Sequence, residues 1–185
     1  MDTLISPPPA LSTIITKVAA ITASAFLAGS TATYSFLWVP SIRNAPEHII
    51  ASQWRIGYRI GFYATVPQCA LCALLWAYLA FTAPAGSRAR MLYTTAAIIV
   101  PSILPYTLTV QRAVNGALDR RAERLAGPGT GSIAETYSRD EKRSKEFGEG
   151  ESTTALVESW GRYNMVRAMI VVLGTACGAW AAVSS

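Results

Sequence analysis

The chain has 185 residues, of which 51% are hydrophobic and 15% charged, with a mean hydropathy of +0.30. A soluble domain usually carries about 25% charged residues, so this composition indicates a membrane protein. The net charge of +5 does not indicate binding to nucleic acid, because the basic residues flank apolar segments, as expected of membrane proteins, and form no patch interleaved with aromatic residues.

Four apolar segments are long enough to cross a bilayer, which takes about 20 residues, and they run from about residue 18 to 39, 61 to 81, 91 to 110 and 165 to 183. The first is expected to be a retained span, because a signal peptide has a basic n-region and a shorter apolar core. We therefore predict an all-α fold. It is a four-transmembrane-helix bundle with a helical extension and a polar linker between helices three and four. Residues 1–17 are expected to form a flexible tail, and residues 18–185 one membrane domain.

Lysine and arginine are distributed unevenly among the connections between these segments. The third connection, about residues 111–162, holds nine of them, whereas the second holds only Arg88 and Arg90. Basic connections stay on the cytosolic side, so we expect the first and third connections to be cytosolic and both termini to be lumenal or external. We expect a multi-pass protein of an endomembrane such as the endoplasmic reticulum, with the lipid bilayer as its partner. A homo-oligomer is compatible with the sequence.

The second apolar segment is preceded by Trp54 and Tyr58, which share a helical face with Gly61. Tryptophan and tyrosine at the start of a span are usually interfacial belt residues, and this interpretation stands beside that of a binding face.

The third segment holds Pro101 and Pro105, each of which removes a helix hydrogen bond and bends the helix. Thr107, Gln111 and Asn115 then follow at four-residue spacing, so we expect them on one face of a helix that continues out of the membrane. Two amides and a hydroxyl on one stripe predict a polar seam that faces the bundle rather than lipid.

The fourth segment is led by Trp160, Asn164 and Arg167, whose spacing of i, i+4 and i+7 places them on one helical face. Arg167 is expected at the membrane boundary or slightly inside it, where an arginine serves equally well as a positive-inside anchor or as a functional group. All three polar stripes lie at the same predicted side of the membrane, so together they predict one pocket.

Ligand sets for haem, iron or zinc and motifs for flavin or nicotinamide cofactors are absent from the sequence. His48 is the single histidine, and no carboxylate cluster lies within the spans. Cys69 and Cys72 form a CxxC inside an apolar run, which predicts small hydrophobic side chains rather than a redox or metal site. We expect neither a metal nor an organic cofactor.

Four stretches carry a family resemblance: FLAGSTATYSFLWVP, QWRIGYRIG, LPYTLTVQRAVNGAL and WGRYNMVRAMIVVLGTACG. From about Leu27 to Ala182 the chain resembles the DUF1772 family of small four-helix membrane proteins, and in particular the fungal anthrone oxygenases. It departs from them at QRAVN, where members often read Met-x-Pro-Thr-Asn, and at Asn164, where many relatives have histidine.

The resemblance implies oxygenation of an anthrone, a small aromatic polyketide intermediate, to an anthraquinone, with molecular oxygen as co-substrate and without a metal or flavin. Arg167 and Asn115 would then stabilise the oxyanion, while His48, a tyrosine, or a water held by Asn164 would remove the proton. Substrate contacts are expected from the remaining candidates, Trp160, Trp54, Tyr58, Gln111 and Tyr106.

Two alternatives are open at this point. The departures at QRAVN and Asn164 could mark hydroxylation or cyclisation of a different polyketide or terpenoid intermediate. A non-catalytic membrane scaffold for soluble pathway enzymes is the second alternative.

Overall fold

The computed structural model describes residues 11–126 and 141–184, and the regular elements within them are all helical. In chain order they are α1 (Leu11–Thr33), the π-helix η1 (Tyr34–Trp38), α2 (Val39–Ile42), α3 (Glu47–Thr82), α4 (Arg88–Ile99), the 3-10 helix η2 (Val100–Ser102), α5 (Ile103–Thr109), α6 (Arg112–Ala126), α8 (Glu141–Gly148) and α9 (Thr153–Ser184).

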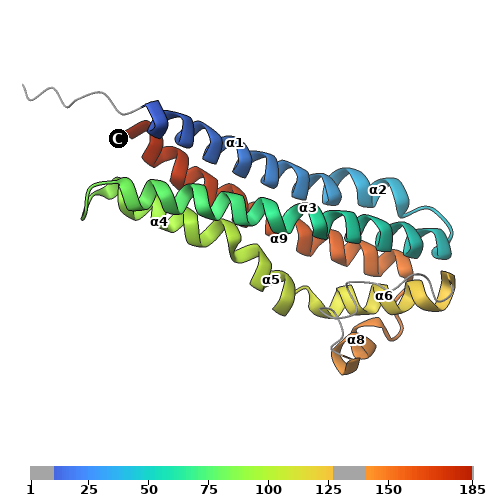
Figure 1. Cartoon of the computed structure of the whole chain (residues 1–185). Helices are drawn as coiled ribbons and strands as arrows, with labels where there is room; N and C mark the ends of the chain where they lie inside the picture. The colour runs from blue at the N-terminus through green and yellow to red at the C-terminus, as the bar shows by residue number, and fades with distance from the viewer. Residues whose placement is uncertain (1–10, 127–140, 185) are drawn as a thin grey trace, which may run out of the picture.

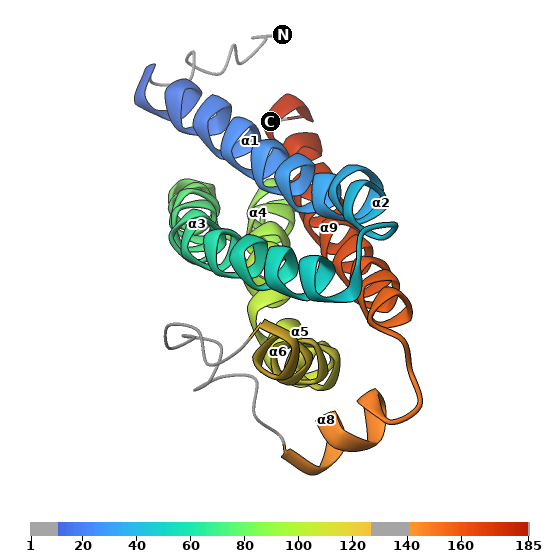
Figure 2. The ribbon, with the colours of Figure 1, turned by 90° about the vertical axis from the view of Figure 1, so that its right-hand side faces the viewer.

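Within the described residues, four helical stretches are long and apolar enough to cross a membrane: Leu11–Ile42, Glu47–Thr82, Arg88–Thr109 and Thr153–Ser184. They pack side by side as an elongated bundle, with α6 and α8 at one end (Figure 1). Figure 2 looks onto that end, where α2 meets α3 and α8 leads into α9. The predicted all-α bundle is confirmed, and its four apolar helices are those of an integral membrane protein.

The helices extend beyond the apolar segments that predicted them. Helix α1 begins at Leu11, so residues 11–17 are helical, although they were predicted to belong to the tail; residues 1–10 lie outside the described part. Leu11, Ile14 and Ile15 are exposed and add an apolar strip to the outer surface of α1. Helices α3 and α9 also begin early, because their first turns pack against α6 at the end of the bundle.

Two hydrophobic clusters fill the bundle at different heights. One contains Trp76, Tyr93 and Val171, and the other contains Trp54, Leu118 and Trp160. Cys69 and Cys72 are fully buried in the first cluster, where they pack as small apolar side chains. In α3 the first cluster begins at Cys69 and the second ends at Tyr58, so the helix has an interval between them that belongs to neither cluster.

Glycines allow two indole rings to lie directly against neighbouring helices. A Cβ atom at Gly57 of α3 would collide with the ring of Trp38, which therefore rests on the backbone of α3. At Gly178 of α9 a Cβ would lie 2.5 Å from Cη2 of Trp76. Membrane helices often pack through small residues, which let neighbouring elements come close, because no hydrophobic driving force acts between helices in lipid.

The helix after Pro105 does not continue unbroken, and here the sequence prediction was wrong. Helix α5 ends at Thr109 and α6 starts at Arg112, while the N–H groups of Val110 and Gln111 both donate to the carbonyl of Tyr106, at 2.9 and 3.3 Å. The β-branched residues before the break are weak helix formers, and the charged face of α6 favours the bundle end over the lipid. Thr107 and Asn115 therefore do not share one continuous helical face.

A buried ion pair fixes α6 against α3. Arg55 donates from Nε to Oδ1 of Asp119 at 3.2 Å and from Nη2 to the Asp119 carbonyl oxygen at 2.8 Å. The two side chains are 10% and 3% exposed, so the pair is shielded from solvent and belongs to the packing of this end of the bundle.

Candidate active site

A cavity of about 610 Å³ occupies the interval between the two hydrophobic clusters. Its walls come from η1 and the three helices α1, α3 and α9, together with α5. The lining is mostly apolar and includes five aromatic rings, those of Phe26, Tyr34, Tyr58, Phe62 and Trp160. A volume of this size accommodates a small organic ligand, and flat aromatic rings favour a flat apolar one.

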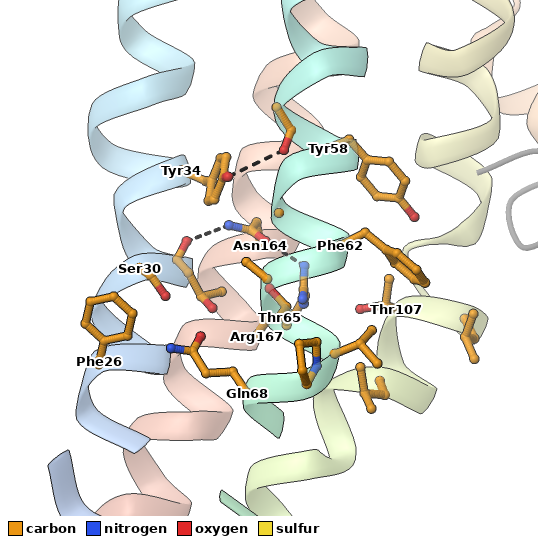
Figure 3. Close-up of a pocket in the computed structure, with 18 of the residues that line it drawn as sticks. Phe26, Ser30, Tyr34, Tyr58, Phe62, Thr65, Gln68, Thr107, Asn164 and Arg167 are labelled. Carbon is orange, nitrogen blue, oxygen red and sulfur yellow. Dashed lines mark hydrogen bonds between the residues drawn. The ribbon is translucent and has the colours of Figure 1, made fainter. Parts of the chain in front are cut away.

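The cavity reaches the lipid-facing surface of the bundle. Three of its lining side chains, Phe26, Leu71 and Leu108, are also exposed large hydrophobic residues. Figure 3 shows Phe26 and Gln68 on the α1 side of α3 and Thr107 on the α5 side, with Arg167 between them. An apolar ligand dissolved in the bilayer therefore has a direct route to the interior.

Arg167 is the single charged residue among the described residues that line this cavity. Its Nη1 donates to Oδ1 of Asn164 at 2.9 Å, while its Nε is buried and has no hydrogen-bond partner among the described residues. No ion pair of the described residues includes Arg167. A guanidinium in an apolar cavity without a carboxylate partner is suited to bind an anionic oxygen.

Asn164 holds this arginine in place from α9. Its Nδ2 donates to the carbonyl oxygen of Thr31 at 2.6 Å, and its Oδ1 accepts the hydrogen bond from Arg167. Nδ2 also lies 3.5 Å from the hydroxyl of Ser35, inside the π-helix η1. Single π-helical turns occur frequently at functional sites, and this one lies where α1 meets the asparagine.

The aromatic residues form a connected cluster at one end of the cavity. Trp160 makes edge contacts with the rings of Tyr34 and Trp54, with centroids 6.0 and 6.3 Å apart. Trp54 in turn stacks on Tyr58, with centroids 5.1 Å apart and an interplanar angle of 18°. Because Trp54 covers one face of the Tyr58 ring, Trp54 supports the cavity wall from behind instead of touching a ligand itself.

Tyr58 lines the cavity, and its hydroxyl lies against Asn115, which is outside the cavity wall. The amide nitrogen of Asn115 donates to the Tyr58 hydroxyl at 3.4 Å, a long hydrogen bond that leaves the phenolic proton free to be donated. Asn115 and Gln111 are both buried and lie outside the cavity wall. The predicted seam is therefore split: Thr107 lines the cavity, and the two amides form a layer behind it.

Five of the candidate residues have a buried nitrogen or oxygen without a hydrogen-bond partner among the described residues: Trp54, Gln111, Asn115, Trp160 and Arg167. Buried polar groups are hydrogen-bonded in the great majority of cases, so each exception calls for an explanation. Their concentration around the cavity and the layer behind it is consistent with a site that takes up a polar ligand group.

His48 and Tyr106 lie apart from the cavity wall. His48 is exposed in the first turn of α3, nine residues before Gly57, the first α3 residue of the wall, which corresponds to about 13 Å along a helix. At that distance the imidazole of His48 does not reach a ligand in the cavity, so His48 is not positioned as the base. Tyr106 is partly buried in α5, and its carbonyl oxygen accepts the hydrogen bonds of Val110 and Gln111 at the break before α6.

Sequence reasoning missed five polar residues of the cavity: Ser30, Thr31, Tyr34, Thr65 and Gln68. Gln68 left a signal, because it is an isolated amide within the apolar run VPQCALC. Tyr34 left none, because the π-helix changes the register of its turn and so its direction.

Comparison with known proteins finds related sequences. The sequence profile described as anthrone oxygenase matches residues 54–177, which include the parts of α3, α5 and α9 that line the cavity. The chain is also similar to a protein named anthrone oxygenase encC from Aspergillus fumigatus, with 34% identity over 113 residues. That match covers 57% of this chain and 61% of the relative, which is less than two thirds of its length. No solved structure matches the chain.

Proposed function

Because the chain belongs to the anthrone oxygenase family, we propose that it is a membrane-bound oxygenase that converts an anthrone-type polyketide intermediate to an anthraquinone. Molecular oxygen is the co-substrate, and the reaction proceeds without a metal or an organic cofactor. The named relative supports the substrate class, and the aromatic-walled cavity supports a flat, apolar ligand.

The observation that carries this proposal is the guanidinium of Arg167, which lines the cavity and has no carboxylate partner among the described residues. An anthrone has a methylene group opposite its carbonyl, and loss of one methylene proton moves negative charge onto the carbonyl oxygen. A preorganised donor at that oxygen stabilises the enolate more than the neutral ketone, which is the condition for lowering the barrier. Arg167 is positioned for this role by Asn164.

The reaction is balanced with oxygen alone. The enolate is electron-rich and transfers an electron to O2, and recombination forms a carbon–oxygen bond at the former methylene carbon. The resulting hydroperoxide loses water to give the second carbonyl. In total the methylene loses two hydrogen atoms and gains one oxygen atom, and the other oxygen atom leaves as water.

Proton removal is assigned to water and not to a strong protein base. The described residues that line the cavity include neither a carboxylate nor an imidazole, and His48 lies outside the wall. Stabilisation of the enolate by Arg167 makes the methylene proton easier to remove, so a weak base suffices. Tyr34 and Tyr58 line the same cavity, and their hydroxyl oxygens can accept further hydrogen bonds from the ligand.

Both reactants reach the cavity from the bilayer in this proposal, because an anthrone and O2 are both more soluble in lipid than in water. The basic connections, α6 among them, face the cytosol of an endomembrane such as the endoplasmic reticulum, and the termini lie on the other side. The cavity's exposed apolar side chains support the lateral route.

The test is turnover by the full-length protein in nanodiscs, incubated with emodin anthrone under ¹⁸O2. We expect emodin to form faster than in empty nanodiscs and to carry one labelled oxygen atom. A rate equal to that in empty nanodiscs would contradict the proposed activity. Stoichiometric iron or copper in the active protein would contradict the cofactor-independent part alone.

A further inference from the structure

Gln68 is a partly buried amide far from either end of the membrane-spanning part of α3. It lies 14 residues before the end of α3 at Thr82, which corresponds to about 21 Å along a helix. The short connection between α3 and α4 marks the membrane boundary at that end, so the amide is too deep to reach the headgroup region. Polar side chains at such depth are rare in membrane helices and serve functional sites or interhelical contacts.

An interhelical contact does not explain this glutamine. No hydrogen bond of the described residues involves Gln68, and Ser30 of α1, which lines the same cavity, donates its hydroxyl proton to the Leu27 carbonyl at 3.1 Å. The side chain instead lines the cavity, on the α1 side of α3 (Figure 3). Its amide keeps both a donor and an acceptor for a ligand.

Thr65, one turn before Gln68, strengthens this observation. Threonines in these helices generally donate to the carbonyl four residues earlier, as Thr94 and Thr107 do. Thr65 makes no such bond and has no other hydrogen bond among the described residues, although it too lines the cavity. Two adjacent polar side chains of α3 are thus uncommitted and face the same space.

We propose that Gln68, with Thr65, forms a subsite that hydrogen-bonds a hydroxyl substituent on the aromatic ring of the substrate. This inference rests on the proposed function and specifies it. Arg167 binds the oxygen that becomes negative, and Gln68 binds a ring hydroxyl on the α1 side of the cavity. Two separated polar contacts fix the orientation of a flat ring that apolar walls alone would let rotate.

The experiment compares two substrates with two glutamine variants in nanodiscs. Gln68→Leu is expected to lower kcat/KM for emodin anthrone, which has ring hydroxyls, by about tenfold, and to leave unsubstituted anthrone unchanged. Gln53→Leu is the matched control, because Gln53 is exposed on the same helix and lies outside the cavity wall. Equal losses for both substrates, or no loss for either, would overturn the subsite.

A binding measurement separates failure of the subsite from failure of the proposed function. Affinities of hydroxylated and unsubstituted anthraquinone are measured from the quenching of tryptophan fluorescence, which needs no turnover. Gln68→Leu is expected to remove the preference for the hydroxylated ring, and Thr65→Val to reduce it; an unchanged preference in both variants contradicts the inference. If Gln68→Leu fails to fold, Thr65→Val alone decides in the same way.

Discussion

The amide oxygen of Asn164 accepts a hydrogen bond from Nη1 of Arg167 at 2.9 Å, and the two residues lie one turn apart on α9. The amide nitrogen of the same asparagine is committed to the Thr31 carbonyl at 2.6 Å. Asn164 therefore connects the guanidinium to the backbone of α1. Because Asn164 is neutral, it orients the arginine without cancelling its charge.

Replacing Asn164 by aspartate tests the importance of that neutrality. The new carboxylate would form an ion pair with Arg167 and repel an anionic ligand oxygen. We expect kcat/KM for emodin anthrone to fall by about 100-fold, comparable to the loss of one oxyanion donor. Asn44→Asp, in the exposed loop between α2 and α3, is the control for the added charge and should leave turnover unchanged. Undiminished turnover in Asn164→Asp would show that the charge of Arg167 is not used.

The buried ion pair between Arg55 and Asp119 makes a prediction about stability. Asp119→Leu removes the carboxylate that pairs with the buried Arg55 guanidinium, which keeps its hydrogen bond to the carbonyl at position 119, and we expect it to lower the free energy of unfolding by about 3–5 kcal/mol. The comparison is Glu158→Leu, which breaks the exposed pair with Arg43 and should have an effect of less than about 1 kcal/mol. Unfolding is followed by circular dichroism in detergent.

The double variant Arg55→Met/Asp119→Leu completes this comparison. It removes both charges, and it should recover most of the stability lost in Asp119→Leu. If Asp119→Leu destabilises the protein no more than Glu158→Leu, then the ion pair does not hold α6 against α3.

Gly57 gives a packing prediction. A methyl group there would collide with the ring of Trp38, and we expect Gly57→Ala to destabilise the protein by about 1–3 kcal/mol, as overpacking does. Gly29→Ala is the control, because a Cβ there meets no atom within 4 Å and alanine is the better helix former. Thermal unfolding of the two variants should shift in opposite directions; a shift of the same size and sign would refute the close contact.

The fold was predictable because each membrane-spanning helix appears in the sequence as an apolar run long enough to cross a bilayer. The lengths of the helices were less predictable, because the first turns of α3 and α9 are stabilised by packing against α6 and not by lipid. The break at Val110 and Gln111 was missed for a related reason, since neither proline nor glycine marks it.

The candidate site was predictable where it lies on one regular helix. Trp160, Asn164 and Arg167 share a face of α9, and all three line the cavity. Tyr34 was missed because it lies in the π-helix, where the register of the turn changes, and Asn115 lies behind the cavity wall because the helix is broken before α6. The roles proposed for these residues remain predictions that mutagenesis can decide.

The most direct test of the site is the rate of anthraquinone formation by Arg167→Met in nanodiscs, corrected for spontaneous oxidation. Arg162→Met is the matched control, because Arg162 is exposed on the same helix and bonds only to Ser159 among the described residues. We predict a loss of at least about 100-fold in kcat/KM for Arg167→Met and wild-type turnover for Arg162→Met. Wild-type turnover by a folded Arg167→Met protein would contradict the assignment of Arg167 as the group that stabilises the enolate.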